Sequence, residues 1–223
     1  MNALLQQGWL SRCPPDFQQA VLERGKAQRY AARDFVFHLG DAPAGIYGIV
    51  AGTFGVTAAP ERNVPRLSLL LYPGAWFGEG PLMTGQRRRV AAQAHTAGEV
   101  IYLSIEEVNA LCEAAPARHR LFGMLAFENL AVAANIVTDL QLRRSEARLA
   151  AALLRAAGRT VLTLDRALFP VRLSQAELGE IANVSRQVVN GTLRRWQAAG
   201  WIDVRYGEVV VHNLERLLEC TAD

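Results

Sequence analysis

The chain has 223 residues, of which 51% are hydrophobic, so it can bury a core and is not globally disordered. The net charge of +3 and the sequence pI near 9.0 permit nucleic-acid binding but do not require it. Three distant cysteines, Cys13, Cys112 and Cys220, exclude a disulfide framework and a C-x-x-C metal site. Because the first ten residues also lack the basic segment and cleavage motif of a secretion signal, we expect a cytoplasmic protein with reduced cysteines.

The first half of the chain changes from helical to strand-like patterns. Residues 1–30 are expected to form short helices. Over residues 31–103, short apolar runs such as FVFH, IYGIV and LSLLLY alternate with turns that contain glycine. Short strands at regular spacing are typical of a β-sandwich or a small barrel. Ser104 and Glu107 then form a capping-box pattern that predicts a helix through about Cys112.

A long helix is predicted over about residues 116–144, and it is apolar on most of its faces. A membrane-spanning helix is disfavoured, because Glu128, Asn129 and Asn135 would be costly at bilayer depth. A helix of this kind must be covered from two directions. We expect the barrel to cover one side and a second copy of the helix to cover the other, which predicts a homodimer.

The second half of the chain alternates helices with short β elements. A helix is predicted over residues 145–158, and the segments VLTL (161–164) and VRL (171–173) predict a short β element. Two helices follow over residues 174–199. The end of the chain predicts a hairpin with its turn at Tyr206-Gly207 and a last helix, LERLLE.

The helix pair has the local signals of a helix-turn-helix. Ser174 and Glu177 form a capping box for the first helix, and Asn183 suits a left-handed turn residue. Ser185 then caps the second helix. Two short helices joined by a turn of three or four residues match the DNA-recognition motif. A plain helical hairpin with a solvated polar face is the alternative, but the following hairpin at residues 201–211 resembles a wing and favours DNA binding.

The second helix carries the side chains that such a motif presents to DNA. Arginine pairs with guanine through two hydrogen bonds, and glutamine or asparagine does so with adenine. Arginines further along the helix reach phosphates. The candidate DNA-binding residues are Ser185, Arg186, Gln187, Asn190, Arg194 and Arg195.

Nearly the whole chain resembles the superfamily of the cyclic AMP receptor protein and the fumarate–nitrate reduction regulator. Three segments carry the resemblance: Gly40-Asp41 with IYGIVAGTFGV, the stretch PGAWFGE continued by QRRR and AAQAHTAGEVIYLS, and the motif around Ser185-Arg186 with its wing. The resemblance implies a homodimeric bacterial transcription regulator that acts on double-stranded DNA and RNA polymerase. It also implies an effector in the barrel that repositions the recognition helices.

The middle segment resembles the family's effector-binding cassette. Glu79 and Arg88 match the residues that bind ribose and phosphate in cyclic AMP receptors, and a helix start with an arginine is a suitable anion site. The candidate effector-binding residues are Gly78, Glu79, Arg88 and Arg89.

Other features of the cassette disfavour cyclic AMP. Arg89 replaces the hydroxyl residue that follows the phosphate arginine, and Ala133 and Ala134 replace the Thr-Ser pair that holds the adenine. Pro81 and a shortening by one residue alter the cassette further. Two alternatives remain: an anion held by Arg87, Arg88 and Arg89, or a filled barrel in which Glu79 pairs with one of these arginines.

The residue types also indicate whether the chain could hold an iron–sulfur cluster or haem, or act as an enzyme. A four-cysteine iron–sulfur cluster is excluded, because only Cys13 lies near the N-terminus. Haem remains open, since His38, His95, His119 and His212 are available but none stands out. The chain has no G-x-S-x-G, P-loop or H-E-x-x-H motif, so we do not expect an enzyme.

Together these patterns predict an α+β fold: a jelly-roll-like barrel of the cyclic-nucleotide-binding type, a long dimerisation helix and a winged helix-turn-helix. The predicted domains are residues 1–115, 116–144 and 145–223. The predicted function is effector-controlled DNA binding without a membrane. The alternative is a ligand-binding regulatory module that acts on a protein partner and does not bind DNA.

Overall fold

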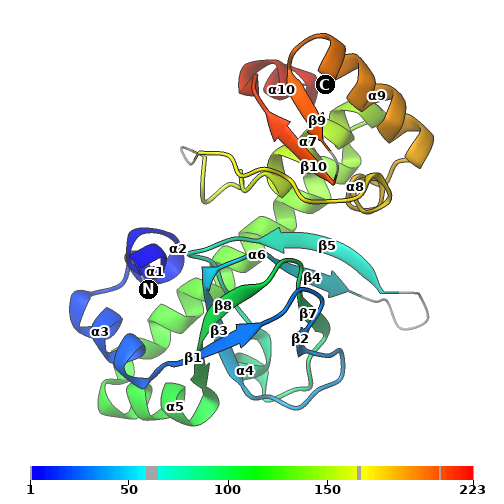
Figure 1. Ribbon diagram of the computed structural model, residues 1–223. Coiled ribbons are helices and arrows are strands. Elements are labelled where there is room, and N and C mark those ends of the chain that lie inside the picture. Colours follow the sequence, from blue (N-terminus) through cyan, green and yellow to red (C-terminus); the bar gives the residue numbers. More distant parts are fainter. Residues whose placement is uncertain (1, 59–64, 165–166, 206, 223) are drawn as a thin grey trace. The chain divides into compact units, whose positions relative to one another are not determined.

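The computed structural model describes residues 2–58, 65–164, 167–205 and 207–222. The chain forms two compact units (Figure 1). The N-terminal unit comprises residues 1–65 and 70–131, and the C-terminal unit comprises residues 132–223 together with 66–69. The boundary lies inside the long helix α6 (His119–Gln141), so this helix contributes to both units.

Three short helices begin the N-terminal unit, as predicted: α1 (Asn2–Gln6), α2 (Gly8–Ser11) and α3 (Pro15–Arg24). Aromatic packing attaches α2 and α3 to α6 (His119–Gln141). The Trp9 ring lies 5.5 Å from the Phe122 ring of α6 and 5.8 Å from the Phe17 ring of α3. The Trp9 indole N–H also donates to the Leu121 carbonyl at 2.6 Å, which satisfies its one polar atom.

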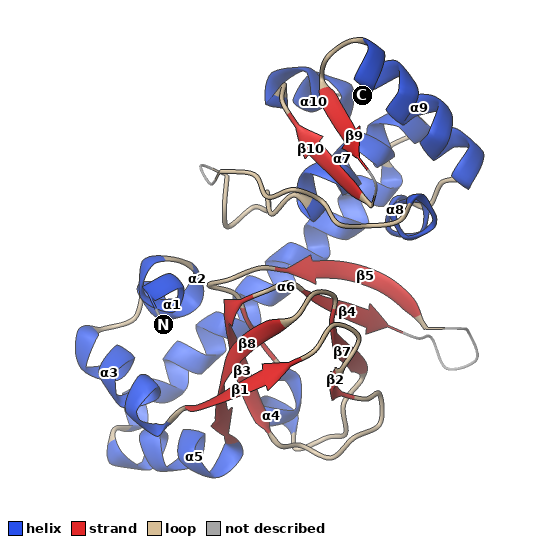
Figure 2. Cartoon of the chain, viewed as in Figure 1, coloured by secondary structure: helices blue, strands red, loops and turns tan. Residues whose placement is uncertain are grey.

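Two four-stranded sheets follow, which confirms the strands predicted for residues 31–103 (Figure 2). The helical expectation for residues 1–30 is wrong at its end, because Lys26–Tyr30 form a strand that pairs with residues 98–102. The strand orders are β1-β8-β3-β6 and β2-β7-β4-β5. The strands are β1 (Lys26–Tyr30), β2 (Phe35–Phe37), β3 (Gly45–Ala51), β4 (Phe54–Ala58), β5 (Arg66–Leu71), β6 (Trp76–Phe77), β7 (Val90–Ala94) and β8 (Gly98–Ser104). The pairs β1·β8, β3·β8, β3·β6, β2·β7 and β4·β7 are antiparallel.

Side chains from both sheets form one aromatic core. The Tyr47 ring of β3 stacks on Phe77 of β6 at 5.4 Å, and Phe37 of β2 lies 6.0 Å from Phe77. Gly48 of β3 leaves room for Trp76 of a separate core cluster, because a Cβ there would lie 2.5 Å from the Trp76 ring. The interior of this small barrel is therefore filled largely by side chains.

Two further helices complete the N-terminal unit before α6: α4 (Gly80–Thr84) and α5 (Ile105–Ala114). The Ser104 hydroxyl accepts the Glu107 N–H at 3.3 Å and caps α5, as predicted. The Glu107 carboxylate accepts a hydrogen bond from Arg24 of α3 at 2.8 Å.

The long helix is confirmed, although its first turn is a 3₁₀ helix at Pro116–Arg118. Large apolar side chains on α6 are exposed: Phe127 by 71%, Leu130 by 62% and Val137 by 58%. They recur at intervals of three and seven residues, which places them on one stripe of the helix. By length and composition alone α6 could cross a membrane, a property that it shares with core helices of soluble proteins.

In its described residues the C-terminal unit contains the end of α6, four further helices and a hairpin. After the end of α6 its elements are α7 (Ser145–Ala156), α8 (Gln175–Ala182), α9 (Arg186–Ala198), β9 (Ile202–Arg205), β10 (Glu208–Val211) and α10 (Leu214–Thr221). The largest buried side chain of this unit is Trp196, and Leu149, Val189 and Leu193 are also buried. The predicted hairpin and last helix are confirmed, and Tyr206 of the predicted turn lies outside the described residues.

The predicted strand at residues 161–164 is wrong, whereas Val171 does form a bridge with Val209 of β10. The VLTL segment forms turns because two threonines hydrogen-bond locally. The Thr163 hydroxyl donates to the Gly158 carbonyl at 2.7 Å and accepts the Thr160 N–H at 2.9 Å. Such side-chain bonds compete with a sheet ladder, so β propensity alone was misleading here.

A buried arginine connects three helices of the C-terminal unit. Arg155 of α7 is 5% exposed and donates to the Asp139 carboxylate on α6. Its other terminal nitrogen donates to the carbonyl of Ile181, in the last turn of α8, at 3.5 Å. Burial lowers the pKa of Arg155 and raises the pKa of Asp139, and the opposite charge of each partner limits both shifts.

Arg155→Met should lower the free energy of unfolding by about 3 kcal/mol, because it leaves a half-buried Asp139 carboxylate without its counter-charge. Urea titration followed by circular dichroism would measure the loss. Arg24→Met is the control: it breaks the exposed pair with Glu107 and should cost less than about 1 kcal/mol. Equal losses in the two variants would contradict this account.

Candidate functional site

The helix pair α8–α9 has the caps and the turn that its sequence predicts. The Ser174 hydroxyl accepts the Glu177 N–H at 3.2 Å, and the Glu177 carboxylate accepts the Ser174 N–H at 2.8 Å, so the capping box is complete. Asn183 ends α8 in the left-handed region with φ 50°. The Ser185 hydroxyl accepts the Val188 N–H at 3.3 Å and starts α9.

Close packing of the turn against α8 determines where α9 starts relative to α8. Leu178, Ile181 and Ala182 of α8 are buried, as predicted. Gly179 allows the turn to approach the helix, since a Cβ there would lie 2.8 Å from the Val184 carbonyl oxygen. The α8–α9 geometry therefore depends on backbone contact as well as on apolar side chains.

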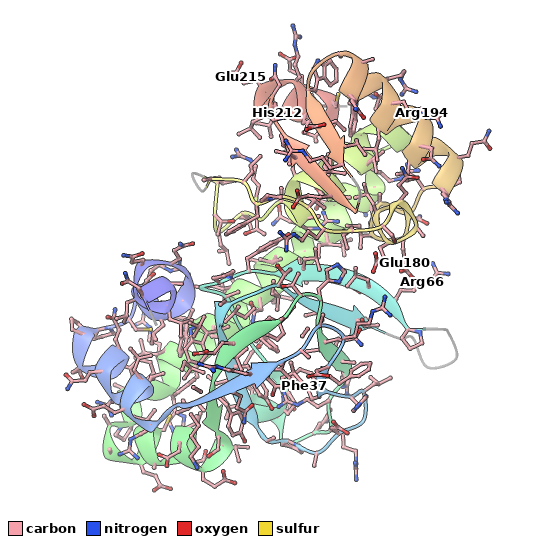
Figure 3. The ribbon with its side chains drawn as sticks, viewed as in Figure 1. Phe37, Arg66, Glu180, Arg194, His212 and Glu215 are labelled. Atoms are coloured by element: carbon pink, nitrogen blue, oxygen red, sulfur yellow. The ribbon has the colours of Figure 1, made fainter. Side chains whose placement is uncertain are left out.

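The outer face of α9 is polar and accessible. Arg186, Gln187 and Arg194 are exposed, and Asn190 is half-buried. With 3.6 residues per turn these four residues lie within about 100° of one another around the helix axis. Figure 3 shows Arg194 extending outward from α9. The predicted base-reading types therefore share one surface, with Ser185 at its N-terminal end.

Arg195 differs from the other predicted DNA contacts. It is turned about 100° from Arg194 and pairs with Glu146 of α7 at 3.2 Å. Glu146 also accepts the Trp196 indole N–H at 2.9 Å. This carboxylate was not predicted because it is distant in the chain, and any phosphate contact of Arg195 would compete with it.

The hairpin β9–β10 follows α9 directly, at the position of a wing. Val211 pairs with Ile202, and Glu208 pairs with Arg205, so the loop has two residues. Gly207 in this loop has φ 69°, which favours glycine. Figure 1 shows the hairpin beside α9 and α10.

The N-terminal unit contains a cavity of about 510 Å³ between α4 and the barrel strands. It brings all four predicted effector-binding residues together. Its lining comprises Phe37, Gly78, Glu79, Gly80, Pro81, Thr84, Gln86, Arg87, Arg88, Arg89 and Val90.

Arg88 is the buried cation of this cavity, with 3% exposure. Its guanidinium donates to the Gly78 carbonyl at 2.7 Å and to the Gly45 carbonyl at 2.8 Å. Its Cζ lies 4.1 Å from the centre of the Phe37 ring, a cation–π contact. Its Nε has no hydrogen-bond partner, and burial lowers the pKa of the guanidinium. These partners are dipoles and a ring rather than a hydrogen-bonded carboxylate, and Gly45 and Phe37 were not predicted.

Glu79 lies at the start of the segment that leads through α4 to Arg88. Burial raises its pKa, against hydrogen bonds from the backbone of Gly78 and Glu79 and from the Asn129 side chain, and against the charge of Arg88. The Asn129 amide also donates to the Trp76 carbonyl at 3.2 Å. Asn129 of α6 therefore positions the Glu79 segment, a role that its chain position did not reveal.

The two neighbouring arginines are exposed at the edge of the cavity. Arg87 donates to the Gly40 carbonyl at 2.8 Å, and Arg89 donates to the Gln86 side-chain oxygen at 2.7 Å. Ala133 and Ala134 are exposed on α6, and their methyl side chains offer no hydrogen-bonding groups. Within the described ranges, no cluster of three His, Cys, Asp or Glu side chains could hold a metal ion.

Comparison with known families assigns each unit. Residues 27–115 match the family "Cyclic nucleotide-binding domain", and residues 147–220 match the family "Crp-like helix-turn-helix domain".

Individual relatives cover the chain to different extents. The cAMP-activated global transcriptional regulator CRP of Salmonella typhimurium is 25% identical over 187 residues, which are 83% of this chain and 89% of the relative. A human potassium/sodium hyperpolarization-activated cyclic nucleotide-gated channel 3 is 31% identical over 132 residues, 59% of this chain but only 16% of the channel.

A solved structure has the same fold. It is a transcriptional regulator of the CRP/FNR family from Thermus thermophilus, with a TM-score of 0.67 and 23% identity over 89% of this chain and 99% of that one. With both domains in the expected order, the chain belongs to the CRP/FNR family of DNA-binding transcription regulators, with a cyclic-nucleotide-binding domain ahead of a Crp-like helix-turn-helix.

Proposed function

We propose that this regulator binds a partly palindromic DNA site as a homodimer in the cytoplasm, where it acts on RNA polymerase, and that a small anion in the N-terminal cavity controls it. The observation that carries the DNA proposal is the outer face of α9. Arg186, Gln187 and Asn190 would read bases there, while Ser185, Arg194 and Arg195 would contact phosphates.

The apolar stripe on α6 supports the homodimer. Phe127, Leu130 and Val137 expose large apolar surfaces that water solvates poorly. With Ala134 they follow the three–four spacing of a coiled-coil seam, which a second copy of α6 would cover by two-fold symmetry. The two α9 helices would then meet half-sites about 34–36 Å apart.

The buried guanidinium of Arg88 supports an anionic effector. A buried charge that only dipoles and a ring stabilise gains most from an opposite charge, and its free Nε can donate to one. Arg87 and Arg89 at the cavity edge add positive potential. The missing hydroxyl after Arg88 and the methyl groups of Ala133 and Ala134 disfavour cyclic AMP itself.

A selection on random duplex DNA, with and without cyclic AMP, tests the proposed function. We expect an enriched palindrome whose enrichment does not depend on cyclic AMP. Arg186→Ala should then lose about 1–3 kcal/mol of specific binding, concentrated at one base pair of each half-site.

The control for this selection is Arg195→Ala, which removes an arginine that Glu146 already holds and should change binding less than Arg186→Ala does. Enrichment only with cyclic AMP would contradict the assignment of the effector. No enrichment in either arm would favour a module that acts on a protein partner.

Leu130→Glu should convert the dimer into a monomer, because it places a charge in the centre of the proposed seam. Sedimentation velocity would show the change, and affinity for the selected palindrome should fall at least tenfold. Leu39→Glu is the control, since Leu39 is exposed but lies outside α6. Unchanged sedimentation of Leu130→Glu would rule out this seam.

Stability should depend on pH through Glu79. Because burial raises its pKa, the folded chain holds a proton at pH values where the unfolded chain, with the usual value of about 4.3, has released it. This contribution to stability is present at low pH and is lost as pH rises through the folded pKa.

Glu79→Gln should therefore be more stable than the wild type at pH 7, with a difference that disappears toward pH 4. Thermal melts from pH 4 to 8, without added ligand, would measure it. Glu113→Gln removes an exposed carboxylate of α5 and serves as the control. A Glu79→Gln variant that is less stable at pH 7 would refute this role.

A further inference from the structure

The glycine of α9, Gly191, is required neither by a packing contact nor by a backbone angle in the described part of the chain. Gly191 is the sixth of thirteen residues in this helix and is exposed. Glycine is a poor helix former, because it loses more backbone entropy on folding than any other residue. A glycine in the middle of an exposed helix therefore needs an explanation.

The intramolecular explanations fail for Gly191. It is not among the glycines with positive φ, so the backbone does not require it. A Cβ built there would meet one atom within 4 Å, a terminal nitrogen of Arg195 at 3.9 Å, which is ordinary contact. Gly179 in the neighbouring helix is the opposite case, since its Cβ would collide with the Val184 carbonyl. Alanine would thus fit at 191 and would improve the helix.

The position of Gly191 on α9 indicates which part of a bound DNA would lie against it. In an α-helix it lies one turn after Gln187 and one turn before Arg194 and Arg195. It borders the base-reading residues on the side of Arg195, away from Asn190. Along the axis of α9 the proposed base-reading residues come first and the proposed phosphate contact Arg194 comes later, so Gly191 lies between the two sets.

We propose that the sugar–phosphate backbone of one DNA strand packs directly against α9 at Gly191, so that the missing side chain sets how deeply this helix enters the major groove. Close approach of a protein backbone to a ligand is a recurrent reason for glycine. This inference rests on the proposed use of α9 for DNA binding. It adds a steric determinant of affinity that carries no hydrogen bond.

The inference predicts opposite effects on stability and on binding. Gly191→Ala should raise the melting temperature by about 2–4 °C, because alanine is the better helix former. The same methyl group should weaken binding to the selected palindrome at least tenfold. Because the contact is to the backbone, the loss should be the same factor on the palindrome and on its single-base variants.

The experiment compares the full-length wild type, Gly191→Ala and Asn109→Ala by thermal melts and by titration of fluorescent duplexes. Asn109 is exposed on α5 in the N-terminal unit, so its replacement improves a helix remote from α9 and should leave DNA affinity unchanged.

The stability and binding measurements on Gly191→Ala can support or overturn the inference. A more stable and weaker-binding Gly191→Ala supports the inference. Equal or tighter binding overturns it, as does a loss confined to one base pair. A wild type that binds no duplex would instead overturn the proposed function.

Discussion

Burial of an arginine charge is the constraint on which both units depend. A guanidinium stays charged at any physiological pH, so it must find partners wherever the fold buries it. Among the described residues the two buried charged side chains are Arg88 and Arg155. Arg155 has a carboxylate partner, and it joins the end of α6 to α7 and to the last turn of α8. That turn leads through Asn183 to the start of α9, so the charge supports the orientation of the helix that we propose faces DNA.

Arg88 meets the same constraint with weaker partners. Two carbonyls and an aromatic ring stabilise the cation but do not neutralise it, and one N–H is unpaired. The same type of side chain thus has two roles in one chain: a closed structural contact in the C-terminal unit, and a charge with remaining binding capacity in the N-terminal unit. Burial raises the pKa of Glu79, and the charge of Glu79 raises the pKa of Arg88 against the effect of its burial.

How much could be predicted from the sequence depends on the range of each interaction. The caps Ser174 and Ser185, the turn at Asn183 and the hairpin are set within a few residues, and local sequence patterns predicted each of them. The barrel strands and the long helix followed from periodicity. The strand expected at residues 161–164 failed because local threonine hydrogen bonds outweighed apolar propensity.

The features that were missed connect residues far apart in the chain. Arg155 and Asp139 are 16 positions apart, Arg88 and Gly45 are 43 apart, and Trp196 and Glu146 are 50 apart. No local pattern reports such pairs, because any of several carboxylates or carbonyls could have served. The candidate effector residues were found through family resemblance, whereas their actual partners required the fold.

The pair between Arg195 and Glu146 has a consequence for how the regulator searches a chromosome. Sequence-independent attraction to DNA grows with the number of cations that are free to displace counterions from phosphates. A chain with a net charge of only +3 that also pairs one arginine of α9, the proposed recognition helix, has a small supply of such cations. It should therefore spend less time sliding along unrelated sequence, and reach its sites mainly by repeated encounters from solution.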